Sequence, residues 1–412
     1  MWRVKVFYGW KMATAAAGLQ FLYSALLLQA YGAYVAVVSI ELGWSKTVLS
    51  GGAAILSLEG ALIGPVLGWM VDRMGPRIVV RSGVVLFSLG FLALSHIETL
   101  GGFYATMVLI AVGASLCSYF PLSVALVHFF RRHRTRALSL MTFGIAAGGI
   151  VLPLVGWAMQ QYGWRDVALA SAVAILILGW PLASMIRGDP AEVGETIDGM
   201  PLPESTDPSG EAAVQEPELT AAQALRTKAF WLLGVAHGLA LLVVMAVSVH
   251  AISHMTEGLG YSLPQASFFI TLMTLGQGAG ILLGAVIGDR WDKRRIAAGC
   301  MLGHMTGLLM LTFAMHPSMI IAFGVLHGVA WGVRGPLMQA LRADYFGLRS
   351  IGMILGLSGV LVAVGQMAGP LVAGMTADWT GDYRAGFILL ALLSGLGSAM
   401  FLLARKPALP GG

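Results

Sequence analysis

The chain has 412 residues, of which 57% are hydrophobic and only 11% are charged, and its mean hydropathy is +0.80. A soluble domain of ordinary composition has about a quarter of its residues charged, and a water-soluble fold of this size could not bury so much apolar surface. The net charge of +5 does not indicate a nucleic-acid-binding protein, because the basic residues lie in short loops between apolar segments. Composition therefore indicates a membrane protein.

Twelve apolar segments are long enough to cross a bilayer as helices, which takes about 20 residues. Residues 12–40 contain no charge and are too long for the apolar core of a cleaved signal peptide. The segments of the first half are 12–40, 47–71, 78–97, 100–130, 137–162 and 167–187. Those of the second half are 229–256, 262–288, 296–315, 317–341, 351–377 and 383–404. The predicted fold class is an all-α membrane protein with twelve transmembrane helices.

One long polar stretch, residues 188–228, divides the chain. It holds five prolines and many acidic residues, a composition typical of a flexible linker, with a short surface helix predicted over 219–225. The predicted domains are an N-terminal six-helix bundle (1–187), a cytoplasmic linker (188–228) and a C-terminal six-helix bundle (229–412).

Lys and Arg predict the orientation. With the N-terminus in the cytoplasm, 21 of the 25 basic residues lie on the cytoplasmic side, and Lys46, Arg165 and Arg384 lie outside. Both termini are therefore predicted to be cytoplasmic, in the plasma or inner membrane.

The two halves repeat each other at an offset of 215 to 217 residues. Asp72-Arg73 matches Asp289-Arg290, and Pro153-Leu154-Val155 matches Pro370-Leu371-Val372. Because six helices return the chain to the same side, the halves are predicted to be parallel, pseudo-symmetric repeats.

The segment from Gly68 to Arg77, GWMVDRMGPR, resembles the signature loop between helices 2 and 3 of the major facilitator superfamily. The segment from Asp289 to Arg295, DRWDKRR, is similar to its weaker copy between helices 8 and 9. The resemblance implies a secondary transporter working by alternating access. It also implies a cytoplasmic gate whose residues are Asp72, Arg73, Arg77, Asp289 and Arg290. The alternative is that Arg73 and Arg77 serve only as topological anchors.

Within that superfamily the chain looks most like the bacterial monocarboxylate and oxalate–formate branch. Tyr8-Gly9-Trp10, Gly163-Trp164-Arg165 and Tyr119 carry this resemblance. The branch has an arginine in helix 8, one turn after an aspartate, where this chain has Gly280 and Gly276. Arg334 is expected to take over the anion-binding role from another helix.

Glycines recur every four residues in helices 2 and 8, and helices 5 and 11 contain similar pairs. Small residues at this spacing let helix backbones approach closely in lipid. In the resembled fold these four helices join the two halves, so the glycine ridges are expected at the surface where the halves slide on each other.

Ionisable residues inside a membrane are costly and indicate functional sites. Arg334 lies in helix 10, where Gly335 and Pro336 are expected to break the helix, and the repeat matches it with Tyr119 of helix 4. Arg334 and Tyr119 are the predicted substrate-binding pair, and Glu59 in helix 2 is the predicted proton carrier. The alternatives are that Arg334 braces backbone carbonyls and that Glu59 is a protonated packing residue.

Three further residues complete the predicted substrate site: His250 in helix 7, Gln277 in helix 8 and Tyr23 in helix 1. His250 and His254 share a helix face, but no third ligand accompanies them, so no metal site is predicted. His237 and His327 are weaker candidates.

The sequence shows none of the nucleotide-binding, zinc-hydrolase or serine-hydrolase motifs, so neither an enzyme nor a cofactor is predicted. The expected substrate is a small organic anion resembling a monocarboxylate, and proton symport is the expected form of coupling, if transport is coupled. The transporter is expected to be a monomer and is not expected to bind nucleic acid. The first alternative is efflux of amphipathic compounds, because the 22 Met would suit a cavity that accepts many ligands. The second alternative is a membrane sensor that does not transport.

Overall fold

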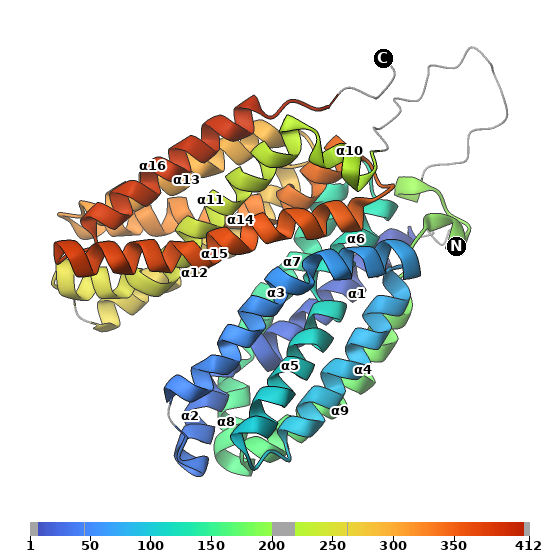
Figure 1. Ribbon diagram of the computed structural model, residues 1–412, viewed down its shortest axis with the longest axis horizontal. Helices are drawn as coiled ribbons and strands as arrows, with labels where there is room; N and C mark the ends of the chain where they lie inside the picture. The colour runs from blue at the N-terminus through green and yellow to red at the C-terminus, as the bar shows by residue number, and fades with distance from the viewer. Residues whose placement is uncertain (1–6, 45, 200–218, 262, 408–412) are drawn as a thin grey trace, which may run out of the picture. The chain divides into compact units, whose positions relative to one another are not determined.

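The computed structural model describes residues 7–44, 46–199, 219–261 and 263–407, and most of these residues are α-helical (Figure 1). The chain divides into two compact units, an N-terminal unit (Met1–Gln215) and a C-terminal unit (Glu216–Gly412). Each unit is a bundle of long helices at the positions of the predicted spans.

The first span of the N-terminal unit has three parts, α1 (Tyr8–Tyr23), a π-helical turn (Ser24–Leu28) and α2 (Tyr31–Leu42). The following helices are α3 (Lys46–Met74), α4 (Pro76–Leu94), α5 (Leu100–Cys117), α6 (Tyr119–Phe129), α7 (Arg134–Ile150), α8 (Leu152–Tyr162) and α9 (Trp164–Met185). The predicted fourth and fifth spans are therefore each divided into two helices.

Proline explains where these two spans divide. A proline inside a helix removes an N–H donor, and its ring collides with the carbonyl four residues earlier. Pro121 would collide with the carbonyl of Cys117, and the helix breaks between them at Ser118, whose φ is −106° and ψ is −144°. Pro153 follows the second break in the same way, and the two pieces there meet at 44°.

The C-terminal unit begins with the short α10 (Ala221–Leu225), which matches the predicted surface helix. Its long helices are α11 (Lys228–Ser253), α12 (Leu263–Ile287), α13 (Lys293–Thr312), α14 (Pro317–Phe346), α15 (Ile351–Thr380) and α16 (Arg384–Leu403), with a π-helical turn (His254–Gly258) after α11. The break expected at Pro336 does not occur, because α14 continues through this residue to Phe346.

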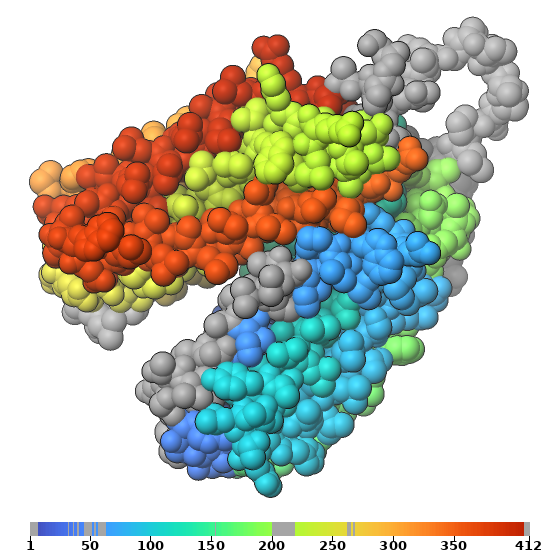
Figure 2. All heavy atoms as spheres, viewed as in Figure 1, coloured from blue at the N-terminus to red at the C-terminus, as the bar shows by residue number. Residues whose placement is uncertain are grey.

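Apolar side chains cover the outside of both units, the reverse of a soluble protein. On α9 the exposed side chains include Val173, Ile177 and Trp180. On α15, which forms part of the visible surface of the C-terminal unit in Figure 2, Val364 and Leu371 are exposed. Within the described residues, nine helical segments are long and apolar enough to cross a membrane, or ten with the bent pair α7 and α8.

The glycine ridges join helices within each unit, so the expectation that they lie between the halves is wrong for helices 5, 8 and 11. A Cβ on Gly144 of α7 would overlap the backbone of Ala17 in α1, and one on Gly280 of α12 would overlap the backbone of Val329 in α14. Gly365 of α15 likewise meets the backbone of α11. Glycine at these positions allows backbone-to-backbone packing inside a bundle.

Both ends of the predicted linker contain local structure. Residues Pro190–Val193 and Ile197–Gly199 form 3₁₀ turns after α9, and the carboxylate of Asp198 accepts hydrogen bonds from the backbone N–H groups of Arg131 and Arg132. At the other end, the N–H of Leu219 donates to the carbonyl of Phe346 at 3.0 Å. The start of the linker therefore packs on the N-terminal unit and its end on the C-terminal unit.

Candidate functional site

Arg334 is the central residue of the candidate site, and its side chain is completely buried. It precedes the end of α14 at Phe346 by about 18 Å, at 1.5 Å per residue, which places it well inside the span. The helix is continuous on both sides of Arg334. Its guanidinium is therefore held on a regular helix and not at a break.

Small residues bring α14 close to the helices on both sides. Added Cβ atoms on Gly328 and Gly332 would overlap the backbone of α12 at Met273 and Gln277. On the other side, a Cβ on Gly307 of α13 would lie 3.4 Å from the backbone N of His327. Polar side chains on these helices consequently meet at short range in the interior of the unit.

Four buried titratable side chains lie within electrostatic range of Arg334. They are His237 of α11, Cys300 and His304 of α13, and His327 of α14. We name these four residues and Arg334 the Arg334 cluster. Its members come from three helices of one unit, so the fold of the C-terminal unit alone assembles them.

A second buried arginine, Arg342, lies two turns after Arg334 on α14, with 3% of the residue exposed. Its Nη2 donates to Nδ1 of His237 at 3.0 Å, and its Nη1 donates to the carbonyl of Met338 at 3.3 Å. The predicted segment 317–341 ends just before Arg342, whereas α14 continues through this residue to Phe346. The bond from Arg342 also fixes Nδ1 of His237 as an acceptor.

His304 and His327 form a hydrogen-bonded pair within the Arg334 cluster. Their Nδ1 atoms are 3.1 Å apart, their ring centroids are 4.5 Å apart, and both residues are 0% exposed. His304 was not among the sequence candidates. The rule that selected Arg334, a titratable residue inside a span, would have selected His304 in the segment 296–315 as well.

Two other predicted site residues, His250 and Gln277, belong to the same unit but are not members of the Arg334 cluster. Nε2 of His250 lies 3.0 Å from the carbonyl of Pro370, and its ring packs against Tyr383 at 5.2 Å between centroids. Gln277 is half-buried on α12, and its backbone carbonyl contacts Gly332 of α14. His250 therefore joins α11 to α15, whereas Gln277 lies at the contact of α12 with α14.

The N-terminal unit supplies the remaining predicted residues. Tyr119 is the half-buried first residue of α6, immediately after the break at Ser118, and Tyr23 is the half-buried last residue of α1, before the π-helical turn. The side chain of Glu59 lies outside the described residues. Pairing of Tyr119 with Arg334 stays a prediction.

Comparison with known proteins identifies the family. The sequence model of the Major Facilitator Superfamily matches residues 15–252 and 233–412. The chain belongs to this superfamily. The predicted family and the prediction that the chain is not an enzyme are confirmed: it is a multi-pass membrane transporter.

Curated relatives agree with the predicted branch of the superfamily. Monocarboxylate transporter 13 of Rattus norvegicus is 24% identical over 404 residues, covering 95% of this chain and 88% of the relative. Monocarboxylate transporter 11 of Mus musculus is 25% identical over 418 residues, covering 94% and 86%. The Fujikurins efflux protein of Gibberella fujikuroi is 25% identical over 352 residues, covering 83% and 70%.

Solved structures agree with the predicted major facilitator fold. The human organic anion transporter MFSD10 matches with a TM-score of 0.71 at 15% identity, covering 96% of this chain and 99% of the other. The E. coli fucose:proton symporter FucP matches with a TM-score of 0.69 at 14% identity, covering 97% and 98%. Their resemblance confirms the twelve-helix fold class.

In this superfamily member the two predicted gate loops differ in detail. Asp72 is exposed near the end of α3, and the neighbouring Arg73 lies over the ring of Trp69 at 5.9 Å. In the second loop Asp292 caps α13, because its side chain accepts from the N–H groups of Arg294 and Arg295. The equivalent position before α4 is Gly75, with a φ of 79° that suits glycine.

Arg77, Asp289 and Arg290 complete the predicted gate. Arg77 lies in the first turn of α4, where Arg81, Arg187 and Glu192 act electrostatically on it. Asp289 is half-buried and Arg290 is exposed after α12. The gate function of these residues stays a prediction.

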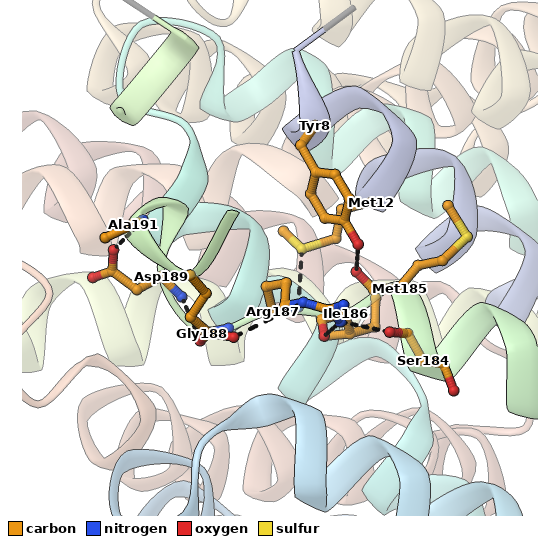
Figure 3. A network of polar contacts seen from close by, with 10 residues as sticks. Tyr8, Met12, Ser184, Met185, Ile186, Arg187, Gly188, Asp189 and Ala191 are labelled. Carbon is orange, nitrogen blue, oxygen red and sulfur yellow. Dashed lines mark hydrogen bonds and ion pairs between the residues drawn. The ribbon is translucent and has the colours of Figure 1, made fainter. Parts of the chain in front are cut away.

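A network of hydrogen bonds joins the start of α1 to the end of α9 and the segment that follows it (Figure 3). The hydroxyl of Tyr8 donates to the carbonyl of Met185 at 2.9 Å, and the N–H of Arg187 points to the sulfur of Met12 at 3.4 Å. The N–H of Tyr8 donates to Glu195 at 2.8 Å. The linker thus contributes a carboxylate that satisfies the first turn of α1.

The opposite end of the N-terminal unit contains an ion pair that the sequence analysis missed. Glu41 at the end of α2 accepts a hydrogen bond from Nε1 of Trp164 at 2.8 Å and pairs with Arg165. Arg165 also stacks on Trp164 at 4.4 Å. Residues that carried the family resemblance therefore tie α9 to α2. In the part of the chain that the structure describes, no group of three or more His, Cys, Asp or Glu could hold a metal ion.

Proposed function

We propose that this transporter moves small organic anions of the monocarboxylate type by alternating access, with Arg334 as the anion-binding group. The observation that carries the proposal is the complete burial of Arg334 deep in α14. A charged guanidinium at this depth is costly and points to a function. Its planar fork of N–H donors matches the two oxygens of a carboxylate.

The relatives support this substrate class. Monocarboxylate transporters 13 and 11 match nearly the full length of the chain, at 24% and 25% identity. This chain has glycine where the resembled branch has its helix 8 arginine, and Gly280 lies against α14, the helix of Arg334. An arginine on the helix packed next to that position is well suited to serve the same ligand.

The other predicted site residues complete the proposal. Tyr119 would donate to the anion from the N-terminal unit, with Tyr23, Gln277 and His250 as further polar contacts. A ligand that contacts both repeats links its binding to alternating access, because only a difference in affinity between two states shifts their populations. We place the monomeric carrier in the plasma or inner membrane with both termini in the cytoplasm. Coupling to a proton would let the transporter accumulate the anion against its gradient. The sequence suggests Glu59 as the residue that binds this proton.

Efflux of amphipathic compounds is the second candidate function. The relative from Gibberella fujikuroi is an efflux protein, and the 22 Met of this chain would suit adaptable apolar contacts. The two functions differ in which side chain matters. Anion transport requires the Arg334 charge, whereas efflux of uncharged amphipathic compounds does not.

The test is uptake of radiolabelled lactate, pyruvate, formate and oxalate into proteoliposomes, together with binding of the same anions in detergent. We expect saturable uptake of at least one anion, weaker binding by Arg334→Lys, and loss of binding by Arg334→Ala in protein that stays folded. Arg349→Ala, which removes an exposed arginine from the loop after α14, is the matched control and should retain uptake.

Unchanged affinity for every transported anion in folded Arg334→Ala protein would defeat the anion site. Absence of anion binding by the native protein, accompanied by raised tolerance of expressing cells to amphipathic drugs, would favour efflux.

A further inference from the structure

We propose that His304 and His327 form a proton-binding site that takes up a proton when an anion binds at Arg334. The inference rests on the proposed anion site and names the group that couples it to protons. It assigns the coupled proton to the interior of the C-terminal unit, in place of Glu59.

The packing of α13 on α14 creates the pair. Gly303 and Gly307 flank His304, and added Cβ atoms there would lie 3.3 Å from Cβ of Ala330 and 3.4 Å from the backbone N of His327. This close approach brings the two Nδ1 atoms to 3.1 Å, within hydrogen-bond distance. Both rings are fully buried, so the bond is shielded from water.

The bond between the rings determines where a proton can bind. A hydrogen bond between two Nδ1 atoms requires one ring to donate Nδ1–H and the other to accept. In the neutral pair the donating ring therefore has an unprotonated Nε2, and the accepting ring carries Nε2–H. Within the described residues neither Nε2 has a hydrogen-bond partner. The pair thus presents one buried basic nitrogen, and a proton added there gives an imidazolium that still donates through Nδ1.

Arg334 connects this basic nitrogen to the anion. It lies seven residues after His327, hence about 10 Å further along the same face of α14. A positive charge on α14 repels a second positive charge on either ring of the pair. A carboxylate bound to Arg334 offsets that charge. The histidine pair then accepts a proton more readily, and by linkage a protonated pair strengthens anion binding.

The other charged and titratable groups around α13 and α14 do not replace the pair. Cys300 lies one turn before His304, and α11 contributes His237, whose Nδ1 already accepts from Arg342. On α14, Asp344 pairs with Lys293 of α13 at 2.9 Å.

The helices that pack from the remaining sides add few charges. Helix α12 contains no titratable residue, α15 contributes only Asp378 near its end, and α16 only Arg384 at its start. From α11, His250 bonds to Pro370, and His254 in the following turn bonds to the carbonyl of Leu311. Within the Arg334 cluster, each member of the pair therefore has a ring nitrogen, Nε2, without a hydrogen-bond partner among the described residues.

Isothermal titration calorimetry of the purified full-length transporter in detergent tests the inference. The best anion from the uptake panel is titrated in two buffers of equal pH but different ionisation enthalpy, so the difference in heat reports the protons taken up. We expect about one proton per bound anion, and an affinity that falls about tenfold per pH unit once the pair is deprotonated.

The variants are His304→Gln, His327→Gln, Glu59→Gln and the control His254→Gln. Glutamine keeps hydrogen-bonding capacity but does not titrate, and His254 is an equally buried histidine of the same unit that lies outside the Arg334 cluster. Both pair variants should bind the anion without proton uptake and with a flat pH profile. The control His254→Gln should keep the proton uptake of the native protein, and Glu59→Gln tests the histidine pair against the proton carrier predicted from the sequence.

Anion binding with full proton uptake in folded His304→Gln and His327→Gln proteins would overturn the inference. If Glu59→Gln still binds the anion but no longer takes up a proton, the proton belongs to Glu59 and the inference is overturned. This comparison decides the question even if the His304→Gln and His327→Gln proteins do not fold. No proton uptake by the native protein that binds an anion would also overturn it. Absence of anion binding altogether would instead contradict the proposed function.

Discussion

Nη2 of Arg342 donates a hydrogen bond to Nδ1 of His237 over 3.0 Å, which joins α14 to α11 inside the C-terminal unit. Replacing His237 by leucine removes the acceptor while the buried guanidinium remains. We expect a loss of about 1–3 kcal/mol, because a buried donor without its acceptor costs that much. Thermal unfolding in detergent measures the change.

The matched comparison for this bond is the double replacement His237→Leu with Arg342→Met, which removes both partners. It should be more stable than His237→Leu alone, because no donor is then left without an acceptor. Equal or lower stability of the double variant would show that the bond is not what holds α14 to α11.

Gly280 tests the contact between α12 and α14. A Cβ at Gly280 would overlap the backbone of Val329, whereas one at Gly278 on the same helix would meet nothing within 4 Å. Gly280→Ala should therefore lower stability by about 1–3 kcal/mol, the usual effect of overpacking, and Gly278→Ala should not. Equal melting temperatures for the two variants would contradict this packing of α12 on α14.

Asp72 tests the predicted gate. Asp72→Asn keeps the size of the side chain but removes its charge, so contacts with basic groups and helix ends at the gate should weaken. We expect transport in proteoliposomes to fall while expression and melting temperature change little. Asp292→Ala, in the second loop, should lower stability instead, because it removes the side-chain acceptor that caps α13. Full transport by Asp72→Asn would contradict a gate function of Asp72, and the basic residues of this loop would then serve only to orient the chain in the membrane.

Cysteine labelling tests the topology. The bias of basic residues predicts that the linker faces the cytoplasm and that Gly101, exposed at the start of α5, faces outward. An impermeant maleimide added to intact cells should label Gly101→Cys and leave Pro208→Cys unlabelled, in a background lacking Cys117 and Cys300. The reverse pattern would invert the orientation.

The sequence by itself determined the spans, their number and the family. An apolar segment of about 20 residues between charged loops has few alternatives to a membrane helix, because lipid leaves backbone groups no other partners. The positions of α11 and α16 therefore follow the predicted segments closely. Local proline chemistry is less decisive: Pro121 follows a helix break, whereas Pro336 lies within a continuous helix.

Only the tertiary structure decided which faces of the helices meet. Sequence spacing identified the glycine ridges but not their partners, and the structure places Gly280 and Gly365 inside the C-terminal unit. The tertiary structure also pairs Arg342 with His237 and His304 with His327, although the two members of each pair lie on different helices. The physical reason is that periodicity fixes the face of a helix on which a residue lies. Its partner across the interface depends on how closely two backbones approach, and that is set by the packing of the whole bundle.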